Sequence, residues 1–384
     1  MVIRRVLCLN VALSLTAVGT GFIVLDVVVN ALHSQPPRFW AGGTCGNVLA
    51  ILGFLGWKSS AIARLSDDAA GVHVLDDLKR WHVDVHLARV QPRCPTPVLL
   101  QEINKTKSGA PIHRFLWTCP GCGSYFPSFR PVTIKAVEEI LPSLHRSAVF
   151  FFDRVSPGIL RLVRHYAASG SLIVFEPSGT NDPKLFREAL KYTHILKYSQ
   201  QRAHSFSDLL AKISPLLQIE TLGEDGLRYK CNLPEVSDPG WHRLEGFDAS
   251  SLKDTPGSGD WCTAGILSKV GAGGARGLHA LEEEEVVEAL RYGQALAAWN
   301  CSFEGARSGM YSISKHDFNK TISQIIRGQA RAYATKATLT DAQKHSLAIF
   351  CPNCDSSPAP PSRVQTHDGE ERSHCQGPPS HSTP

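Results

Sequence analysis

The residues best suited to chemistry lie in one short segment of small residues next to a carboxylate. Gly257, Ser258 and Gly259 stand directly before Asp260, and the residues that follow have the small, apolar character of a packed helix. The first turn of a helix offers unpaired N–H groups and the positive end of the helix dipole. Glycines let these groups close around a phosphate or an oxyanion. The segment therefore predicts an anion-binding turn.

Asp260 is the informative residue of this turn. A carboxylate repels a bound phosphate, so a loop that only binds phosphate would avoid it. Its presence is explained if Asp260 takes a proton from a hydroxyl that attacks the phosphate. The competing interpretation is an ordinary turn in which Asp260 caps the helix. Taken alone, the segment favours that ordinary turn.

The elements that must position these residues follow a regular alternation. Short apolar runs, which we interpret as buried strands, occupy residues 148–152, 171–175, 195–198 and 217–222. Segments with helical spacing of apolar residues lie between them, at 157–169 and 183–192. This alternation predicts an α/β fold: a mostly parallel central sheet with helices on both faces. Ligands of such sheets bind beyond the carboxyl ends of the strands.

Other segments complete the expected architecture. The apolar residues up to Leu25 are interpreted as a first buried parallel strand that ends in Asp26. Residues 91–130 break the rhythm and predict a small β extension from the main sheet. The glycine-rich residues 268–282 predict a surface loop, and residues 281–301 predict one helix.

Three motifs, in order along the chain, resemble those of the ribokinase-like (PfkB-type) family of sugar and nucleoside kinases. Residues 254–267, DTPGSGDWCTAGIL, resemble the C-terminal signature of the family. Residues 41–50, AGGTCGNVLA, are similar to its N-terminal signature, and residues 221–226, TLGEDG, resemble its Thr-x-Gly-x-x-Gly nucleotide turn. The resemblance covers about residues 15–335. It implies a three-layer Rossmann-like sandwich with a small β lid within about residues 91–130.

The resemblance also implies an ATP-dependent kinase that phosphorylates a hydroxyl of a small sugar or sugar derivative. Asp260 matches the general base, and the backbone of Gly257, Ser258 and Gly259 matches the anion hole. The residues that match the acceptor site are Asp26, Gly42, Gly43, Asn47, Asp153 and Arg154. The residues that match the ATP site are Ser199, Thr221, Gly223, Gly226, Asn300 and Gly305. For Asn300, a role as a helix-end cap is an equally good interpretation.

One departure from the family concerns the metal. Many relatives carry Asn-x-x-Glu after the third strand, where it organises magnesium and phosphate, but residues 199–202 here are SQQR. Arg202 is interpreted either as a direct phosphate contact or as a surface residue. Phosphoryl transfer uses a divalent ion to bridge phosphate oxygens, so ATP and Mg²⁺ are the expected cofactors. Asp254 alone does not decide whether a monovalent cation is bound.

The motifs leave two alternative functions open. One is a nucleoside kinase, because the family phosphorylates both substrate classes. The other is a catalytically weak regulatory or binding protein on the same scaffold, which the missing Asn-x-x-Glu favours and the retained Asp260 opposes. The expected partners are a small sugar and ATP. Lids in this family sometimes form dimer contacts, so a homodimer is also left open.

Two cysteine pairs repeat one motif. Cys119 and Cys122, like Cys351 and Cys354, are the ends of a Cys-Pro-x-Cys turn, which directs two thiolates at one metal. Two such turns complete a structural four-cysteine Zn²⁺ site. The pairs lie 229 positions apart (351 minus 122), so the site would clamp the C-terminal segment onto the lid. The alternative is two unrelated surface turns.

Composition and the chain ends limit the remaining classes. The 384 residues are 43% apolar, which excludes wholesale disorder, and a net charge of +5 gives no reason to expect a nucleic-acid partner. Eleven cysteines in a long chain predict a reduced, cytoplasmic protein. Residues 1–14 are an N-terminal extension, interpreted as a signal or a strand extension and too short to predict a membrane span. Residues 336–384 are a C-terminal extension, expected to be disordered from about 355.

Overall fold

The computed structural model describes residues 15–30, 36–90, 94–105, 111–180, 182–210, 213–234, 236, 238, 240–248, 252–329, 347–351 and 353–354. The predictions for residues 1–14, for the boundary near 335 and for disorder from about 355 lie outside these ranges.

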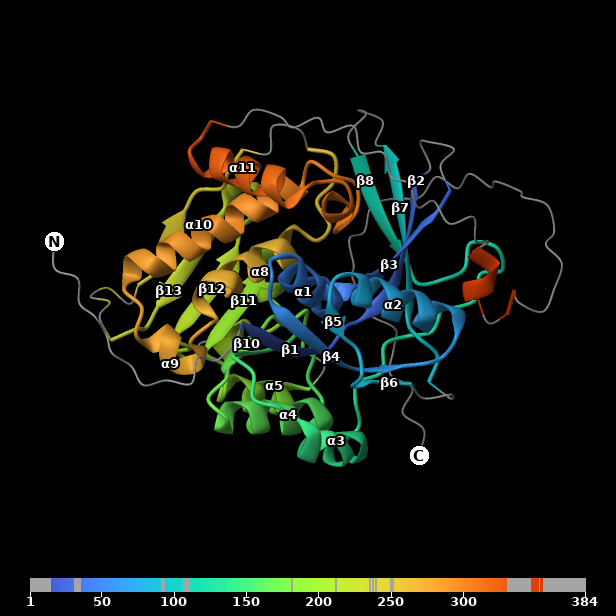
Figure 1. Ribbon diagram of the computed structural model, residues 1–384, viewed down its shortest axis with the longest axis horizontal. Helices are drawn as coiled ribbons and strands as arrows, with labels where there is room; N and C mark the ends of the chain where they lie inside the picture. The colour runs from blue at the N-terminus through green and yellow to red at the C-terminus, as the bar shows by residue number, and fades with distance from the viewer. Residues whose placement is uncertain are drawn as a thin grey trace.

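A mostly parallel sheet forms the centre of the molecule (Figure 1). Its strand order is β14 (His242–Leu244), β13 (Leu227–Cys231), β12 (Leu217–Thr221), β11 (Ile195–Ser199), β10 (Leu172–Phe175), β9 (Val149–Phe152), β1 (Thr16–Thr20), β4 (Lys58–Leu65) and β5 (Val83–Asp84), and β6 (Ala88–Val90) also pairs with β4. The pairs from β12 to β5 are parallel, whereas β13 and β14 are antiparallel. The four predicted apolar runs are β9, β10, β11 and β12. Every residue of β9 and β10 is buried, because helices cover both faces of the sheet.

Helices form a layer on each face of this sheet. Figure 1 shows α3 (Ile134–Ile140), α4 (Pro157–Ala168) and α5 (Pro183–Leu190) on one face, and α1 (Gly43–Phe54), α8 (Ser258–Val270) and α10 (Glu283–Asn300) on the other. The helices predicted at 157–169 and 183–192 are α4 and α5, and the one predicted at 281–301 is α10. α2 (Ala69–Arg80) and α11 (Lys315–Ile326) extend the second layer. The predicted three-layer α/β architecture is therefore confirmed.

A second, four-stranded sheet forms the lid. Its order is β3 (Arg38–Gly42), β2 (Val24–Asn30), β7 (Val98–Lys105) and β8 (Pro111–Leu116). β7 and β8 fall within the range predicted for the lid, but β2 and β3 come from before it. The lid is therefore larger than the sequence indicated, because it includes strands on both sides of α1.

The prediction that Asp26 ends the first strand of the main sheet is wrong. The apolar run contains two strands: β1 ends at Thr20, and the chain turns at Gly21 into β2, which belongs to the lid. Gly21 has φ +140°, and a Cβ there would lie 1.7 Å from Asp153 Oδ1, so this turn requires glycine. Hydropathy alone does not separate two consecutive buried strands of different sheets.

The glycine-rich segment predicted as a loop is mostly helical. α8 continues to Val270, and a short helix, α9, spans Gly274–His279. Two four-residue helices, α6 (Gln200–Ala203) and α7 (Ser207–Leu210), follow β11. Four 3₁₀ turns complete the described elements: η1 (Leu141–Ser143), η2 (Gly223–Asp225), η3 (Ser308–Tyr311) and η4 (Leu347–Phe350).

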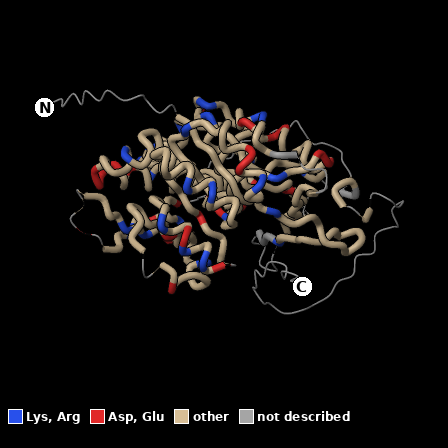
Figure 2. The backbone as a smooth tube through the Cα atoms, turned by 90° about the horizontal axis from the view of Figure 1, so that it is seen from below, with Lys and Arg blue, Asp and Glu red and all other residues tan. Residues whose placement is uncertain are grey.

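Charge is distributed rather than gathered on one side. Figure 2 shows basic and acidic residues interspersed along the described backbone in that view. None of the helices in the described ranges combines the length and apolar character needed to cross a bilayer.

Candidate active site

The carboxyl ends of the central strands bring several polar residues to one edge of the sheet. Thr20, Phe152 and Phe175 are paired in register, so the residues that follow the last two, Asp153 and Glu176, leave the sheet at the same level. Helices α1 and α8, whose first turns carry two of the predicted motifs, pack against each other above the sheet. The candidate site is built where these helix N-termini meet the strand ends.

The glycine turn before α8 has the backbone that the sequence predicted. Gly257 is the N-cap of the helix and has φ +77°, in the left-handed region. A Cβ at this position would lie 2.6 Å from the Cα of Ala306, so glycine is required for two reasons. Ser258 and Gly259 open the helix, and their backbone is part of its first, unpaired turn. The local geometry is that of an anion-binding helix start.

Residues 300–306 brace this turn. The indole N–H of Trp261 donates to the Ala306 carbonyl at 3.0 Å, and Asp254 accepts the Gly305 amide at 2.6 Å. Asn300 is fully buried and donates to the Pro256 carbonyl at 2.9 Å. Two residues that the resemblance placed at ATP, Asn300 and Gly305, thus make contacts that hold the glycine turn.

Asp260 lies in the first turn of α8 and is only partly buried. The Asn47 side-chain amide, from the first turns of α1, donates to Asp260 Oδ2 at 2.7 Å. Burial raises the pKa of Asp260 to about 7, and the negative charge of Glu176 adds to this increase, while Asn47, Lys197 and Arg202 oppose it. A carboxylate with such a pKa is suited to accept a proton near neutral pH.

A buried ion pair lies beneath the glycine turn. Lys197 Nζ is 2.7 Å from Glu176 Oε1, and the Thr263 hydroxyl donates to the other carboxylate oxygen at 2.5 Å. A Cβ at Gly259 would be 3.7 Å from Lys197 Nζ and 3.8 Å from Glu176 Oε1, so the pair is in contact distance of the predicted anion hole. Burial opposes the charge on Lys197, but Glu176, Cys262 and Asp260 together outweigh it, so the pKa of Lys197 is raised.

Sequence reasoning named neither member of this pair as a site residue. The available signal was Lys197 itself, a charged residue inside a run that otherwise predicts a fully buried strand. Glu176 had a weaker signal, because it directly follows the predicted strand at 171–175.

Asp26 projects from β2 toward the start of α1. A Cβ on Gly42 would lie 1.9 Å from Asp26 Oδ2, so Gly42 leaves room for this carboxylate. Burial raises the pKa of Asp26 to about 7, although Arg307 and the Gly43 amide favour the charged form. Asp26 Oδ1 is buried and has no hydrogen-bond partner among the described residues. A buried acceptor without a donor is costly, and a substrate hydroxyl would satisfy it.

Arg307 is the residue that the sequence analysis missed most completely. It is 1% exposed and comes from the segment after α10. Its Nε donates to Asn47 Oδ1 at 2.9 Å, its Nη2 lies 2.7 Å from Asp77 Oδ2, and Nη2 also donates to the Ala41 carbonyl. The Tyr311 hydroxyl donates to Asp77 Oδ1 at 2.7 Å.

A continuous chain of hydrogen bonds therefore runs from Asp77 through Arg307 and Asn47 to Asp260. It joins α2 and β3 to α1 and α8, that is, the lid to the helix that carries the carboxylate. No local motif marks Arg307, since its partners lie up to 266 positions away in the sequence.

Asp153 and Arg154 follow β9 and lie against the turn at Gly21. Asp153 is buried, accepts the Phe22 amide at 2.8 Å, and is paired with Arg154 Nη1 at 3.1 Å. Arg154 also lies over the Phe22 ring, 4.9 Å from its centroid, and its side chain is 27% exposed. Asp153 thus holds the turn, and Arg154 is the member of the pair that solvent reaches.

The predicted nucleotide turn joins β12 to β13 at the same edge. Thr221 is paired with Ser199 of β11, so the two residues predicted for ATP lie side by side. Gly223 and Gly226 have φ +68° and +89° and enclose the 3₁₀ turn η2. A Cβ at Gly226 would lie 2.2 Å from the Leu244 carbonyl. The two glycines thus shape a tight turn that follows directly after the residue paired with Ser199.

The structure also brings the four predicted metal ligands together. The Sγ atoms of Cys119, Cys122, Cys351 and Cys354 all lie within 4.8 Å of one another. They belong to the lid side of the molecule, where the turn after β8 meets η4.

Comparison with solved structures identifies the fold. The chain is similar to a fructokinase with bound ATP from Xylella fastidiosa (TM-score 0.62, 15% identity, covering 83% of this chain and 99% of that chain). It is similar to a ribokinase from Arabidopsis thaliana complexed with ribose and ATP (TM-score 0.58, 16%, 82% and 99%). A third is aminoimidazole riboside kinase from Salmonella enterica, complexed with its riboside and an ATP analogue (TM-score 0.57, 19%, 80% and 99%).

No protein-family model matches the sequence, and no curated protein sequence matches it significantly. At these low identities the structural likeness establishes the fold: this chain has the ribokinase-like fold, as the three motifs predicted.

Proposed function

We propose that this protein is an ATP-dependent kinase that transfers the γ-phosphoryl group of ATP to a hydroxyl of a small sugar or sugar derivative. The observation that carries the proposal is the position of Asp260. Its carboxylate is held by Asn47, has a pKa near 7, and stands beside a left-handed glycine turn at a helix start. The solved structures of this fold named above include sugar kinases with ATP, which supports the same assignment.

The acceptor is proposed to lie between the lid and the start of α1. Asp26 Oδ1 would accept one of its hydroxyls, and Gly42 and Gly43 allow close approach of the backbone there. Asp260 removes the proton from the attacking hydroxyl. Arg154 supplies a positive charge at the rim, with Asp153 as its buried support.

ATP is proposed to lie over Ser199, Thr221 and the glycines of the following turn. The amides of Gly257, Ser258 and Gly259 would stabilise charge on the transferring phosphoryl group. Lys197 places a positive charge below those amides. We assign Asn300 and Gly305 to the support of this turn, since their hydrogen bonds hold Pro256 and Asp254, which lie just before it.

The residues present also fit a magnesium ion. The negative charge of Glu176 contributes to the raised pKa of Asp260, and a cation between the two carboxylates would relieve that repulsion. Carboxylate oxygens and phosphates are the usual Mg²⁺ ligands. When bound, the ion would neutralise negative charge on the phosphates of ATP. Glu176 therefore offers a carboxylate in place of the Asn-x-x-Glu that this sequence lacks.

The test is ATP consumption across a panel of sugars and nucleosides, with wild-type protein and with Asp260→Asn. We expect turnover with at least one sugar, and a loss of about 10²–10⁴-fold in kcat for the variant, because general base catalysis contributes about this much. ATP affinity, measured by calorimetry, should be unchanged. Asp238→Asn, at a carboxylate whose side chain is 71% exposed, is the matched control and should retain wild-type kcat.

The outcomes separate the alternatives. Turnover of nucleosides alone would replace the sugar with a nucleoside as acceptor, an alternative that the aminoimidazole riboside kinase neighbour supports. ATP binding without turnover on the whole panel would favour a regulatory or binding protein. Undiminished activity of Asp260→Asn would refute the role assigned to this residue.

A further inference from the structure

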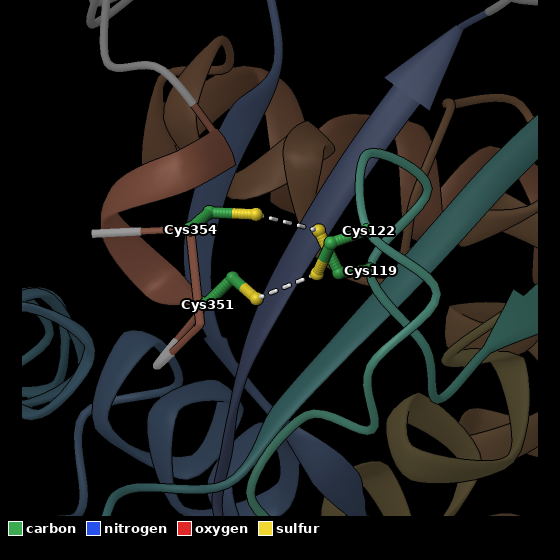
Figure 3. A group of neighbouring side chains, drawn as sticks. All are labelled: Cys119, Cys122, Cys351 and Cys354. Atoms are coloured by element: carbon green, nitrogen blue, oxygen red, sulfur yellow. Dashed lines mark hydrogen bonds between the residues drawn. The ribbon is translucent and has the colours of Figure 1, made fainter. Parts of the chain in front are cut away.

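Four cysteines from two distant segments form a cluster that the kinase chemistry does not use. Cys119 and Cys122 lie in the turn after β8, and Cys351 and Cys354 lie in the turn after η4 (Figure 3). The Sγ atoms of Cys122 and Cys351 are 3.5 Å apart, and those of Cys119 and Cys354 are 3.7 Å apart. All four Sγ atoms lie within 4.8 Å of one another.

These distances match a metal tetrathiolate. Zinc–sulfur bonds of about 2.3 Å in a tetrahedron place neighbouring sulfurs about 3.8 Å apart. A disulfide requires about 2.05 Å, so these two pairs are too far apart to be disulfides, and all four cysteines are free. Soft thiolate ligands in a tetrahedral arrangement select zinc or an iron–sulfur centre, and a single ion fits the space that four sulfurs enclose here.

The backbone of each turn orients its two thiols in one direction. The Gly123 amide donates to the Cys119 carbonyl at 2.8 Å, and the Cys119 amide donates to the Ser124 carbonyl at 2.8 Å. Gly123 has φ +74°, which glycine adopts without strain and which lets the chain leave the turn. The Cys354 amide donates to the Cys351 carbonyl at 3.1 Å, so the second turn also closes on its first cysteine, across three positions instead of four.

Burial of the cluster is graded from one side to the other. Cys119 and Cys351 are 3% and 1% exposed, Cys354 is half-buried, and Cys122 is exposed. Two ligands are therefore fixed within the apolar core, while the outer two leave a route for a metal to enter. If the two turns were unrelated surface turns, we would not expect one thiol of each turn to be buried next to the other turn.

The cluster joins parts of the chain that have little other reason to meet. Beside Cys351, the Phe350 ring packs on Phe39 of β3 (5.0 Å between centroids) and on His73 of α2 (5.6 Å). On the other side, the Phe126 amide donates to the Trp117 carbonyl, which closes the turn that carries Cys119. Phe350 thus contacts β3 at one edge of the lid sheet, and Cys351 and Cys354 contact the turn after β8 at the other edge.

We propose that Cys119, Cys122, Cys351 and Cys354 bind one structural Zn²⁺, which clamps the C-terminal segment 347–354 onto the lid. The metal replaces the thiol protons, so four thiols become thiolates around one divalent cation. Without it, four sulfurs at this spacing would gain only weak S–H contacts, which do not offset the entropy of holding a terminal segment in place.

A consequence for the active site follows, and this part depends on the proposed function. The Trp117 ring packs near Phe22, with 6.2 Å between centroids, and the Phe22 amide is bound by Asp153 at the acceptor side. The zinc site therefore fixes a wall of the proposed acceptor site. Loss of the metal should raise the KM for the acceptor several-fold and leave the affinity for ATP unchanged.

The metal itself is tested without any activity measurement. Full-length protein, purified without chelators, is analysed by elemental mass spectrometry and by a colorimetric zinc-release assay. We expect one zinc per chain. Loss of a residue that only supports a metal ligand weakens metal affinity by about 10–100-fold. Cys122→Ser and Cys354→Ser remove a ligand itself, so each should weaken zinc affinity by more than that. Cys375→Ser, at a cysteine that is not one of the four proposed ligands, is the control and should keep a full complement of zinc.

Further readouts decide between the remaining explanations. Replacement of zinc by Co²⁺ should give the intense visible absorption of a tetrahedral thiolate site. Chelation should increase hydrogen exchange in residues 117–126 and leave residues 258–270 protected. Three results would each overturn the zinc proposal: metal-free protein with four titratable thiols, protein with two disulfides at these cysteines, or protein with bound iron in place of zinc. Asp260→Asn should retain its zinc, so failure of the kinase assignment and failure of the metal site are distinguishable.

Discussion

The central sheet and the lid sheet are held together by different means. In the central sheet, β9 and β10 are buried along their whole length and their strands pair with neighbours in parallel register. In the lid, β3 is only half-buried over most of its length, and Phe115 of β8 is 49% exposed. The lid depends on side chains from distant segments: Arg307, and the cysteines of the C-terminal turn.

This difference separates two tasks of the proposed reaction. The groups assigned to phosphoryl transfer, Asp260 and the Lys197–Glu176 pair, lie on or against the rigid central sheet. The groups assigned to the acceptor, Asp26 and Gly42, lie on lid strands. Under the proposed function, burial positions the groups assigned to phosphoryl transfer, and a small number of specific polar contacts position the groups assigned to the acceptor.

The largest effect is expected when the charge balance below the glycine turn is broken. Lys197→Met leaves the Glu176 carboxylate buried beside apolar atoms. Breaking a buried pair in this way costs about 3–5 kcal/mol of unfolding free energy, measurable by urea denaturation. Lys191→Met, in an ion pair whose lysine is 68% exposed, should cost less than about 1 kcal/mol.

A double variant separates stability from chemistry at the same place. Lys197→Met combined with Glu176→Gln removes both charges and should recover most of the stability. It should not recover kcat, because the charge near the anion hole is absent. Full recovery of activity would show that the pair has only a structural role.

A smaller effect is expected at the connection between lid and central sheet. Arg307→Lys retains a positive charge, but an ammonium group lacks the fork that reaches Asn47 and Asp77 together. We expect a loss of about 1–3 kcal/mol of stability from the unsatisfied groups, and a larger rise in the acceptor KM than in the KM for ATP. Equal changes in both KM values would indicate general loosening of the fold instead of a positioning role.

The pH dependence distinguishes the two carboxylates. Deprotonated Asp260 is the competent base, and its pKa is about 7, so kcat/KM should fall about tenfold per pH unit below that value. The pKa of Asp26 is also about 7. If Asp26 must be ionised too, the slope of log kcat/KM against pH rises from one to two on the acid side, and Asp26→Asn restores a slope of one. A profile that is flat from pH 6 to 8 in wild type would contradict the assigned base.

Unfolding does not explain such an acid limb. Both carboxyls have a native pKa of about 7, above the ordinary aspartate value of 3.8 that applies to the unfolded chain. The native state therefore binds more protons than the unfolded state between pH 3.8 and about pH 7. Their contribution to stability is therefore largest at the acidic end of this window and is lost as the pH rises through it.

The smallest effect is expected at the outer end of the hydrogen-bond chain. Tyr311→Phe removes one hydrogen bond to Asp77, which keeps its contacts with Arg307 and with the Ala41 amide. The ring still stacks on Trp40, with 5.4 Å between centroids. We expect a loss of about 0.5–1.5 kcal/mol in thermal or urea unfolding. A change in acceptor KM as large as that of Arg307→Lys would place Tyr311 closer to the acceptor than its contacts indicate.

Much of the central sheet was predictable from hydropathy, and much of the lid was not. β9 to β12 appear as separate apolar runs because both faces of a parallel sheet are buried. The division of one apolar run into β1 and β2 was missed, since only the turn at Gly21, which is packed against Asp153, sends the chain into a second sheet. The carboxylate Asp26 therefore belongs to the lid and not to the main sheet.

By itself, the sequence determined the local elements of the site: a glycine turn before a helix, a carboxylate in its first turn, and two cysteine turns. These depend on backbone conformation and on residues a few positions apart. Only the tertiary structure decided which of them meet. It placed Lys197 and Glu176 under the turn, joined Arg307 to Asn47, and brought Cys122 to 3.5 Å from Cys351. Such contacts arise from the packing of segments far apart in the chain, and no local spacing encodes them.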